Sequence, residues 1–297
     1  MYQLTHHHVM SLILLNIVYS SDVLDEKVIP RILNLHPIQH TTSHMEGKVV
    51  GGKSGSLEQF PFQAQVYNLG AICAGTILNS WTILTVAHCF DHNKNVRELE
   101  VQTGSKYLYG FKAKKYNVSS LVVHKAYNTT AQFSNDIALI FLTSPVEFGK
   151  LVQKGILVDN GKWMSKYEKN FIVSGWGWTQ YGGPISQRGL LTTHLGYVPS
   201  RQCGRFHNLS LTPDMFCLYG DGERDTCKGD SGTGVLWNGY IVGITSHGDG
   251  CAKKYKPSVY TNVWYFRDWI EKHINNFFKA FCKFNQTSVQ KKLKTKT

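Results

Sequence analysis

The chain has 297 residues, of which 42% are hydrophobic, so it is too long for a peptide hormone and has enough apolar side chains to build a core. Its 27 Gly follow no three-residue period, which excludes a collagen-like fibre, and no apolar run reaches the ~20 residues of a membrane-spanning helix. The net charge of +12 would suit acidic partners, but the sequence has no nucleic-acid-binding motif, and we expect neither a nucleic-acid partner nor a membrane span.

Residues 1–20 predict a secretory signal peptide. A short apolar stretch, 10–18, leads into the small-residue pattern Val18-Tyr19-Ser20, after which we expect cleavage. Three histidines at 6–8 stand where Lys or Arg is usual, and we interpret them as incidental rather than as a metal site. Export predicts a secreted, extracellular protein in an oxidising compartment.

Residues 21–48 are polar, contain no Cys, and are interpreted as a pro-segment. From Val49 onward, short runs rich in β-forming residues are separated by Gly, Asn and Ser. The runs that predict strands include 62–67, 81–86, 137–142, 171–174, 240–245 and 258–263. Many short strands with turns between them indicate an all-β barrel or sandwich.

The segment 264–281 predicts a helix, because its apolar residues recur at helical spacing. These residues are Phe266, Trp269, Ile270, His273, Ile274, Phe277 and Phe278. We expect this helix to pack on the body of the protein rather than on a membrane. Residues 277–297 form a basic tail with six Lys and no acidic residue, which we expect to be disordered beyond the helix. Binding of a polyanion by this tail is an alternative role for the chain.

Seven Cys and four N-x-S/T sequons agree with export. Six of the Cys pair off at plausible loop lengths and leave Cys282, which we interpret as a free or capped thiol rather than a link to another chain. The sequons are candidate glycan sites and begin at Asn117, Asn128, Asn208 and Asn285.

Three short motifs carry the chemistry: 85–89 (TVAHC), 135–139 (NDIAL) and 229–232 (GDSG). A serine hydroxyl is a poor nucleophile at neutral pH, so acyl transfer needs a base for its proton and a carboxylate that holds the base in the right tautomer. Each residue alone has an ordinary explanation as a core or turn residue. The order His88, Asp136, Ser231 is one of the few chain orders in which this geometry is built.

With these motifs and Gly175-Trp176-Gly177, residues 49–276 resemble the trypsin/chymotrypsin family of serine proteases. The resemblance implies an all-β fold of two packed antiparallel β-barrels with a C-terminal α-helix, and an active site between the barrels. It also implies three disulfides, Cys73–Cys89, Cys203–Cys217 and Cys227–Cys251.

The resemblance assigns the roles of the site residues. Ser231 is the nucleophile, His88 the general base and then acid, and Asp136 the orienting carboxylate. The backbone N–H groups of Gly229 and Ser231 would form the oxyanion hole, and Ser246 would support the buried aspartate.

The segment Lys48-Val49-Val50-Gly51-Gly52 resembles the family's activation junction. Cleavage by an activating protease after Lys48 would free the Val49 amine, which by resemblance pairs with Asp230. The full-length chain would therefore be an inactive zymogen.

Asp225 stands at the position of the family's specificity pocket floor, where Asp selects Lys or Arg. Gly248 matches one slim wall of that pocket, but Ser258 replaces the second, which leads us to expect better tolerance of Lys than of Arg. The sequence departs from the family's pattern at further places: His247, His207, Thr233 and Gly234.

We expect no cofactor and no metal. The loop 104–118 corresponds to the calcium-binding loop of some relatives, but it carries four Lys and no acidic residue. The expected partners are protein or peptide substrates, the activating protease and protein inhibitors. A non-catalytic homologue that acts as a binding or cofactor protein is the alternative to an enzyme.

Overall fold

A computed structural model describes residues 49–165, 170–183, 185–186, 189–207 and 211–294, with only the backbone for 284–294. The predicted signal peptide, the pro-segment and Lys48 lie outside the described residues. So does the sequon residue Asn208.

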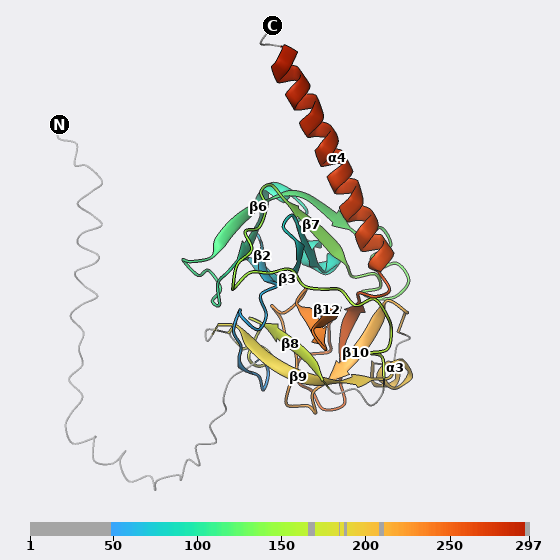
Figure 1. The fold of residues 1–297 in the computed structure, drawn as a ribbon. Helices are drawn as coiled ribbons and strands as arrows, with labels where there is room; N and C mark the ends of the chain where they lie inside the picture. Colours follow the sequence, from blue (N-terminus) through green and yellow to red (C-terminus); the bar gives the residue numbers. More distant parts are fainter. Residues whose placement is uncertain (1–48, 166–169, 184, 187–188, 208–210, 295–297) are drawn as a thin grey trace, which may run out of the picture. The chain divides into compact units, whose positions relative to one another are not determined.

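The first barrel closes six antiparallel strands in the order β2-β3-β4-β7-β6-β5 (blue to green in Figure 1). The strands are β2 (Gln63–Asn68), β3 (Ala71–Asn79), β4 (Thr82–Thr85), β5 (Leu99–Thr103), β6 (Lys114–Val123) and β7 (Ala138–Leu142). Every residue of β4 and β7 is buried, which matches their run of branched and aromatic side chains.

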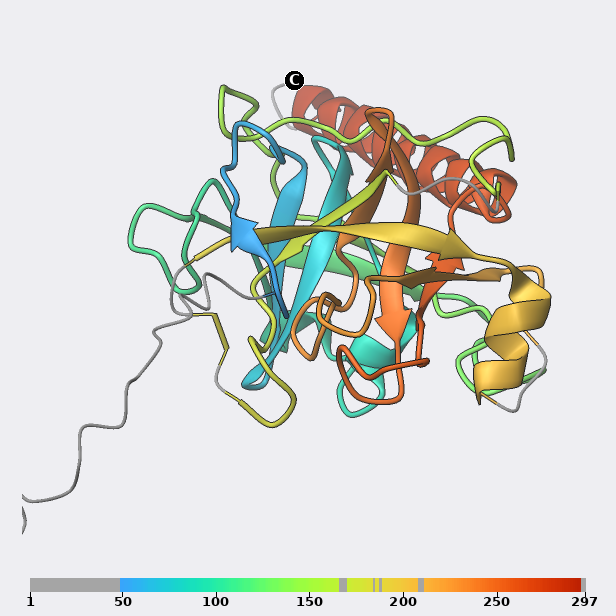
Figure 2. The ribbon, with the colours of Figure 1, turned by 90° about the horizontal axis from the view of Figure 1, so that it is seen from below.

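The second barrel follows the order β9-β10-β13-β12-β11-β8 and is closed by pairing of β8 with β9. Its strands are β8 (Phe171–Gly175), β9 (Leu191–Val198), β10 (Met215–Tyr219), β11 (Gly234–Trp237), β12 (Tyr240–His247) and β13 (Ser258–Asn262). The short β1 (Lys53–Ser54) adds to β9, and Figure 2 shows the two side by side. These two barrels confirm the all-β prediction, and each of the six predicted runs overlaps a strand.

Hydrogen bonds join the two barrels directly. The Ala74 N–H on β3 donates to the Ser231 carbonyl at 2.7 Å, and Thr261 Oγ1 on β13 donates to the Asp136 carbonyl at 2.8 Å. Gln63 Nε2 on β2 donates to Ser174 Oγ on β8 at 2.7 Å. Because two of these bonds end on Ser231 and Asp136, the barrel interface also positions the candidate site.

Two α-helices occur in the described part of the chain: α3 (Ser200–His207) and α4 (Arg267–Lys294). Helix α4 packs on the first barrel, where the rings of Phe277 and Phe141 stack with centroids 4.4 Å apart. The rings of Trp81 and Phe281 lie 5.0 Å apart in the same contact. The helix is therefore packed on the first barrel, in line with the expectation that it packs on the protein.

The prediction of disorder after Phe281 is wrong for residues 282–294. Helix α4 starts three residues later than predicted and continues to Lys294, and its C-terminal turns extend past the strands in Figure 1. No Gly or Pro interrupts residues 267–294, so nothing in the local sequence ends the helix earlier. No helix within the described residues is both long and apolar enough to cross a membrane.

Candidate active site

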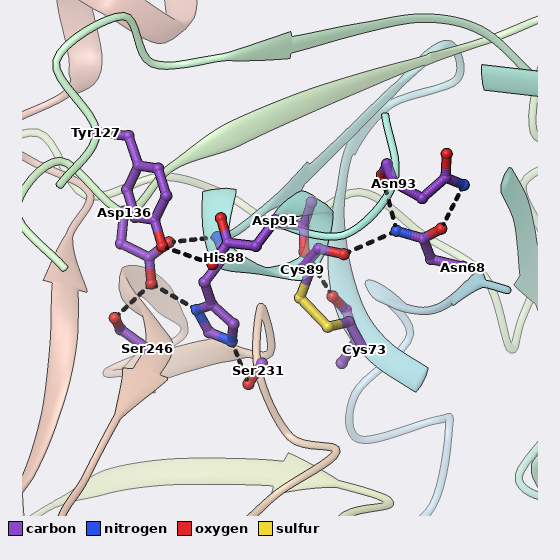
Figure 3. The surroundings of a disulfide bond; sticks show 12 residues. Asn68, Cys73, His88, Cys89, Asp91, Asn93, Tyr127, Asp136, Ser231 and Ser246 are labelled. Atoms are coloured by element: carbon purple, nitrogen blue, oxygen red, sulfur yellow. Dashed lines mark hydrogen bonds and ion pairs between the residues drawn. A yellow bond between two sulfur atoms is a disulfide. The ribbon is translucent and has the colours of Figure 1, made fainter. Parts of the chain in front are cut away.

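Three loops from both barrels bring the site residues together. His88 lies on the 3-10 turn η1 (Ala87–Phe90), which follows β4, and the disulfide of its neighbour Cys89 to Cys73 ties this turn to β3 (Figure 3). Asp136 lies two residues before β7, which begins at Ala138, and Ser231 lies in the turn before β11 of the second barrel. Each side chain thus stands close to the end of a strand.

The residue before Asp136 sets the direction of its loop. Asn135 has a φ of +54°, in the left-handed region that Asn tolerates better than most residues. Its N–H donates to the Asp214 carboxylate at 2.6 Å. These features fix the turn that delivers the Asp136 carboxylate to His88.

A continuous chain of hydrogen bonds links four side chains (Figure 3). Ser231 Oγ lies 2.9 Å from His88 Nε2, and His88 Nδ1 lies 2.8 Å from Asp136 Oδ2. Ser246 Oγ donates to the same Asp136 oxygen at 2.6 Å. The sequence placed all four residues in one site, and the structure brings them into contact.

Asp136 is 1% exposed, and its carboxylate accepts three hydrogen bonds. The third comes from the His88 backbone N–H to Oδ1, at 2.9 Å. Burial by itself lowers the pKa of His88, but the hydrogen bond and negative charge of Asp136 outweigh it and raise the pKa above its ordinary value. The imidazole is thereby oriented with its proton on Nδ1 and made a stronger base at Nε2.

The turn around Ser231 needs its glycines. Gly229 and Gly232 have φ of +102° and +88°, where a Cβ would be strained. Among the described residues, neither the Gly229 N–H nor the Ser231 N–H donates a hydrogen bond. Two such donors next to a candidate nucleophile can bind a negatively charged oxygen if they point to a common position.

A cavity of about 380 Å³ opens beside Ser231. Among its lining residues are Ser246, His247, Gly248 and Ser258, three of which the sequence assigned to substrate binding. A larger cavity of about 870 Å³ lies near the start of α4. None of the residues assigned from the sequence lines it.

Asp225 is 4% exposed and does not line the 380 Å³ cavity itself, but its neighbour Thr226 and its hydrogen-bond partner Ser258 do. Its two oxygens accept from the Thr226 and Ala252 N–H groups at 2.8 and 2.9 Å. Burial raises the pKa of Asp225 to about 7, although hydrogen bonds from Ser258 and from these two N–H groups work against the rise. A cation that enters the cavity would relieve this cost.

Asp230 is fully buried, and none of the described residues forms an ion pair with it. Its oxygens accept from the Gly177 and Cys227 N–H groups at 2.7 and 2.9 Å. Burial raises the pKa of Asp230 to about 6, and its backbone hydrogen bonds oppose the rise.

Val49, at the predicted activation junction, is 1% exposed, and the carbonyl of the next residue, Val50, accepts a hydrogen bond from the Asp225 N–H at 3.1 Å.

The departures from the family pattern differ in how well they fit their surroundings. Thr233 is fully buried and stays outside the left-handed region, so it causes no backbone strain, but its Oγ1 has no hydrogen-bond partner among the described residues. His207 Nε2 lies 2.7 Å from the Pro257 carbonyl, while the His247 ring stacks on Phe133 with centroids 4.4 Å apart.

Sequence reasoning missed several residues around Ser231. They are Phe133, which contacts the His88 ring edge-on, and the cavity-lining Trp178, Tyr181, Thr226 and Lys228. None of them has a local signal, because their roles depend on contacts between distant segments.

The structure contains the three disulfides that the resemblance implies, Cys73–Cys89, Cys203–Cys217 and Cys227–Cys251. Cys282 is exposed on α4, outside any disulfide. Within the described residues, one grouping has metal-ligand spacing, Cys73, His88 and Cys89, but its two sulfurs are bonded to each other. They offer no thiolate to a metal.

Comparisons with known proteins show the family of this chain. A family model described as Trypsin matches residues 49–270, which span both barrels. The chain is 30% identical to "Trypsin epsilon" of Drosophila erecta over 232 residues, or 77% of this chain and 88% of the relative. It is 32% identical to "Trypsin" of Phaedon cochleariae over 228 residues, or 75% and 87% of the two chains. With both barrels inside the matched range, the chain belongs to the trypsin family of serine proteases.

Proposed function

We propose that this chain is a trypsin-like serine endopeptidase, secreted as a zymogen, that cleaves peptide bonds after Lys or Arg. The observation that carries the proposal is the unbroken hydrogen-bond chain from Ser231 through His88 to Asp136. Three disulfides support secretion, since such bridges persist in oxidising compartments.

The proposed reaction has two halves. Ser231 Oγ attacks the substrate carbonyl carbon while its proton passes to His88 Nε2, and the Gly229 and Ser231 N–H groups hold the oxygen that becomes negative. The tetrahedral intermediate collapses as His88 gives that proton to the leaving amine. Water then attacks the acyl-enzyme with His88 again as base, and Ser231 is regenerated.

In the proposed zymogen, cleavage after Lys48 supplies the cation that Asp230 lacks. The new Val49 amine would pair with the Asp230 carboxylate, whose raised pKa of about 6 reports how costly the charge is without a partner. Because Asp230 stands between Gly229 and Ser231, fixing it also fixes both oxyanion donors.

The proposed preference for a basic residue rests on Asp225, and the preference for Lys rests on Ser258. A Cβ on Gly248 would lie 2.9 Å from Ser258 Oγ, so the serine reaches across a narrow cavity. It also hydrogen-bonds Asp225. The slimmer ammonium group of Lys fits above this serine more easily than the wide, planar guanidinium of Arg.

We expect Ser258→Gly to change this preference. The wild-type processed enzyme should cleave after Lys with about tenfold higher kcat/KM than after Arg, and the variant should raise the Arg value by about tenfold, since one extra group in a pocket has effects of this size. Matched peptide p-nitroanilides that differ only in Lys or Arg measure both. A clear Arg preference of the wild type would contradict the expectation.

Binding of a small cation such as benzamidine should depend on pH through Asp225. Its carboxyl has a raised pKa of about 7, and only the ionised form attracts a cation. Affinity should therefore fall about tenfold per unit as pH drops below 7 and level off above it. Calorimetry in two buffers of different ionisation enthalpy would count the proton released on binding at pH 6. The same affinity at pH 5 and pH 8 would argue against this role.

The central test is labelling of the processed chain by a diaryl phosphonate that mimics a Lys substrate. An active nucleophile in the hydrogen-bond chain should be modified at Ser231, and Ser231→Ala should not react. A folded, processed chain that neither reacts nor cleaves peptides would favour the alternative, a non-catalytic homologue that acts by binding.

A further inference from the structure

A second imidazole is connected to Asp136 through Ser246. His247 Nδ1 lies 3.1 Å from Ser246 Oγ, and that oxygen donates to Asp136 Oδ2 at 2.6 Å. The hydrogen-bond chain of the site therefore does not end at Ser246, but continues to His247 on the same strand, β12.

The direction of the last bond follows from the short contact to Asp136. Ser246 has one hydroxyl proton, and at 2.6 Å from a carboxylate oxygen that proton must point toward Asp136. The hydroxyl can then only accept from His247. His247 must carry its proton on Nδ1, which leaves Nε2 as the unprotonated nitrogen.

We propose that His247 is a positioning residue of the active site, whose Nδ1–H donates to Ser246 Oγ and strengthens the hydrogen bond of that hydroxyl to Asp136. A hydroxyl that accepts a hydrogen bond becomes a better donor, because the chain of bonds polarises it. Two imidazoles then act on one carboxylate, His88 directly and His247 through the serine.

The surroundings keep His247 neutral. Burial lowers its pKa to about 4; Asp136 opposes the change, and the nearby His88 and His207 add to it. These three are the titratable groups that act on the ring, and at neutral pH His247 remains a dipole with one donor. It adds no charge that would compete with His88 for Asp136.

Packing is the competing explanation for His247. Its ring stacks on Phe133, whose ring in turn meets His88 edge-on with centroids 5.7 Å apart. An aromatic ring of any kind would serve that stack. The two explanations can be separated because one needs the Nδ1–H group and the other needs the ring.

The test compares His247→Phe with His247→Asn. Phenylalanine keeps the ring and its stack but has no donor, whereas the asparagine amide places an N–H close to the position of Nδ1 and has no ring. If His247 acts by positioning, His247→Phe should lower kcat about fivefold, the size of one neutral hydrogen bond, and His247→Asn should recover most of the loss. A small substrate with only a Lys residue limits the contribution of other subsites.

The decisive readout is the pKa of His88, measured by NMR of labelled histidine and assigned with His88→Gln. A weaker Ser246 bond leaves more negative charge on Asp136 for His88, so the pKa of His88 should rise in His247→Phe and return toward the wild-type value in His247→Asn. In a Ser246→Ala background the two variants should no longer differ, since the connecting hydroxyl is gone.

The inference rests on the proposed function, but the two can fail separately. The NMR comparison needs no turnover, so it decides the role of His247 even in a chain that hydrolyses nothing and resists the phosphonate. A pKa of His88 that stays constant in His247→Phe, or that moves only in His247→Asn, would overturn the positioning role and leave the proposed peptidase intact.

Discussion

Asp136→Asn is expected to lower kcat of the processed enzyme by about 10⁴-fold, the loss that the same change causes in a serine protease with a Ser-His-Asp triad. The reason lies in the number of donors that meet the carboxylate. Asp136 accepts from the His88 backbone N–H, from His88 Nδ1 and from Ser246 Oγ. Asparagine has only one oxygen that can accept these hydrogen bonds, so its NH₂ group faces the remaining donors.

Neither orientation of that amide preserves the base. If the oxygen accepts from the His88 backbone N–H, the NH₂ faces Nδ1, and His88 must shift its proton to Nε2, where Ser231 needs a lone pair. If the amide turns over, two N–H groups face each other in a buried site. The first outcome costs activity, and the second costs stability.

Steady-state hydrolysis of a Lys p-nitroanilide would measure the loss, with thermal unfolding to check the fold. Ser246→Ala is the matched control, because it removes one donor to Asp136 without changing the tautomer of His88. It should cost only about tenfold. An Asp136→Asn enzyme that kept more than a tenth of the wild-type kcat would show that the tautomer is set by something else.

Blocking cleavage after Lys48 is expected to keep kcat/KM at least about 10³-fold below that of the processed enzyme, since loss of even one oxyanion donor has effects of 10²–10³. In the uncut chain the Asp230 carboxylate is buried, has a raised pKa of about 6, and among the described residues accepts hydrogen bonds from backbone N–H groups alone. The turn that carries Gly229 and Ser231 then lacks the ion pair that would fix it.

A foreign protease site ending at residue 48 provides the matched comparison, because the same protein can be assayed before and after cutting. Lys48→Gln, which resists a Lys-specific activator, serves as the second arm. Equal hydrolysis of a small ester by the uncut and cut chains would refute the zymogen proposal.

The same ion pair predicts an alkaline limit for the cut enzyme. An α-amine ordinarily has a pKa near 8, and pairing with Asp230 raises it in the folded state. The stability that the pair contributes is then fully present below about pH 8 and is lost as pH rises through the raised pKa. Activity should fall over the same pH range. Asp230→Asn should remove this alkaline decline together with most of the activity.

Several features of this protein were predictable from local sequence. His88, Asp136 and Ser231 each stand in a short motif whose neighbours shape the backbone, such as the two glycines of 229–232. Strand β7 was predictable because it is a continuous apolar run, and β4 (Thr-Ile-Leu-Thr) because three of its four residues are β-branched. Strand β6 was not predicted, because its N-terminal half exposes Lys114 and Lys115 while only Tyr116 and Val118 face inward.

Contacts between distant segments were outside the reach of such patterns. The stack of Phe133 on His247 joins two barrels, and the bond from Gln63 to Ser174 spans 111 residues. The reach of α4 to Lys294 also escaped prediction, because no stop signal marks its end.

The sequence by itself determined which residues are the candidates for the chemistry, since a nucleophile, a base, a carboxylate and paired cysteines are properties of side chains and of the short turns that hold them. Tertiary structure alone decided how those groups act on one another. It placed Ser258 against Asp225, buried Asp230 away from any cation of the described residues, and set His247 behind Ser246. The physical reason is that burial and hydrogen bonding depend on the few ångströms between segments far apart in the chain, and only the packing of the two barrels sets those distances.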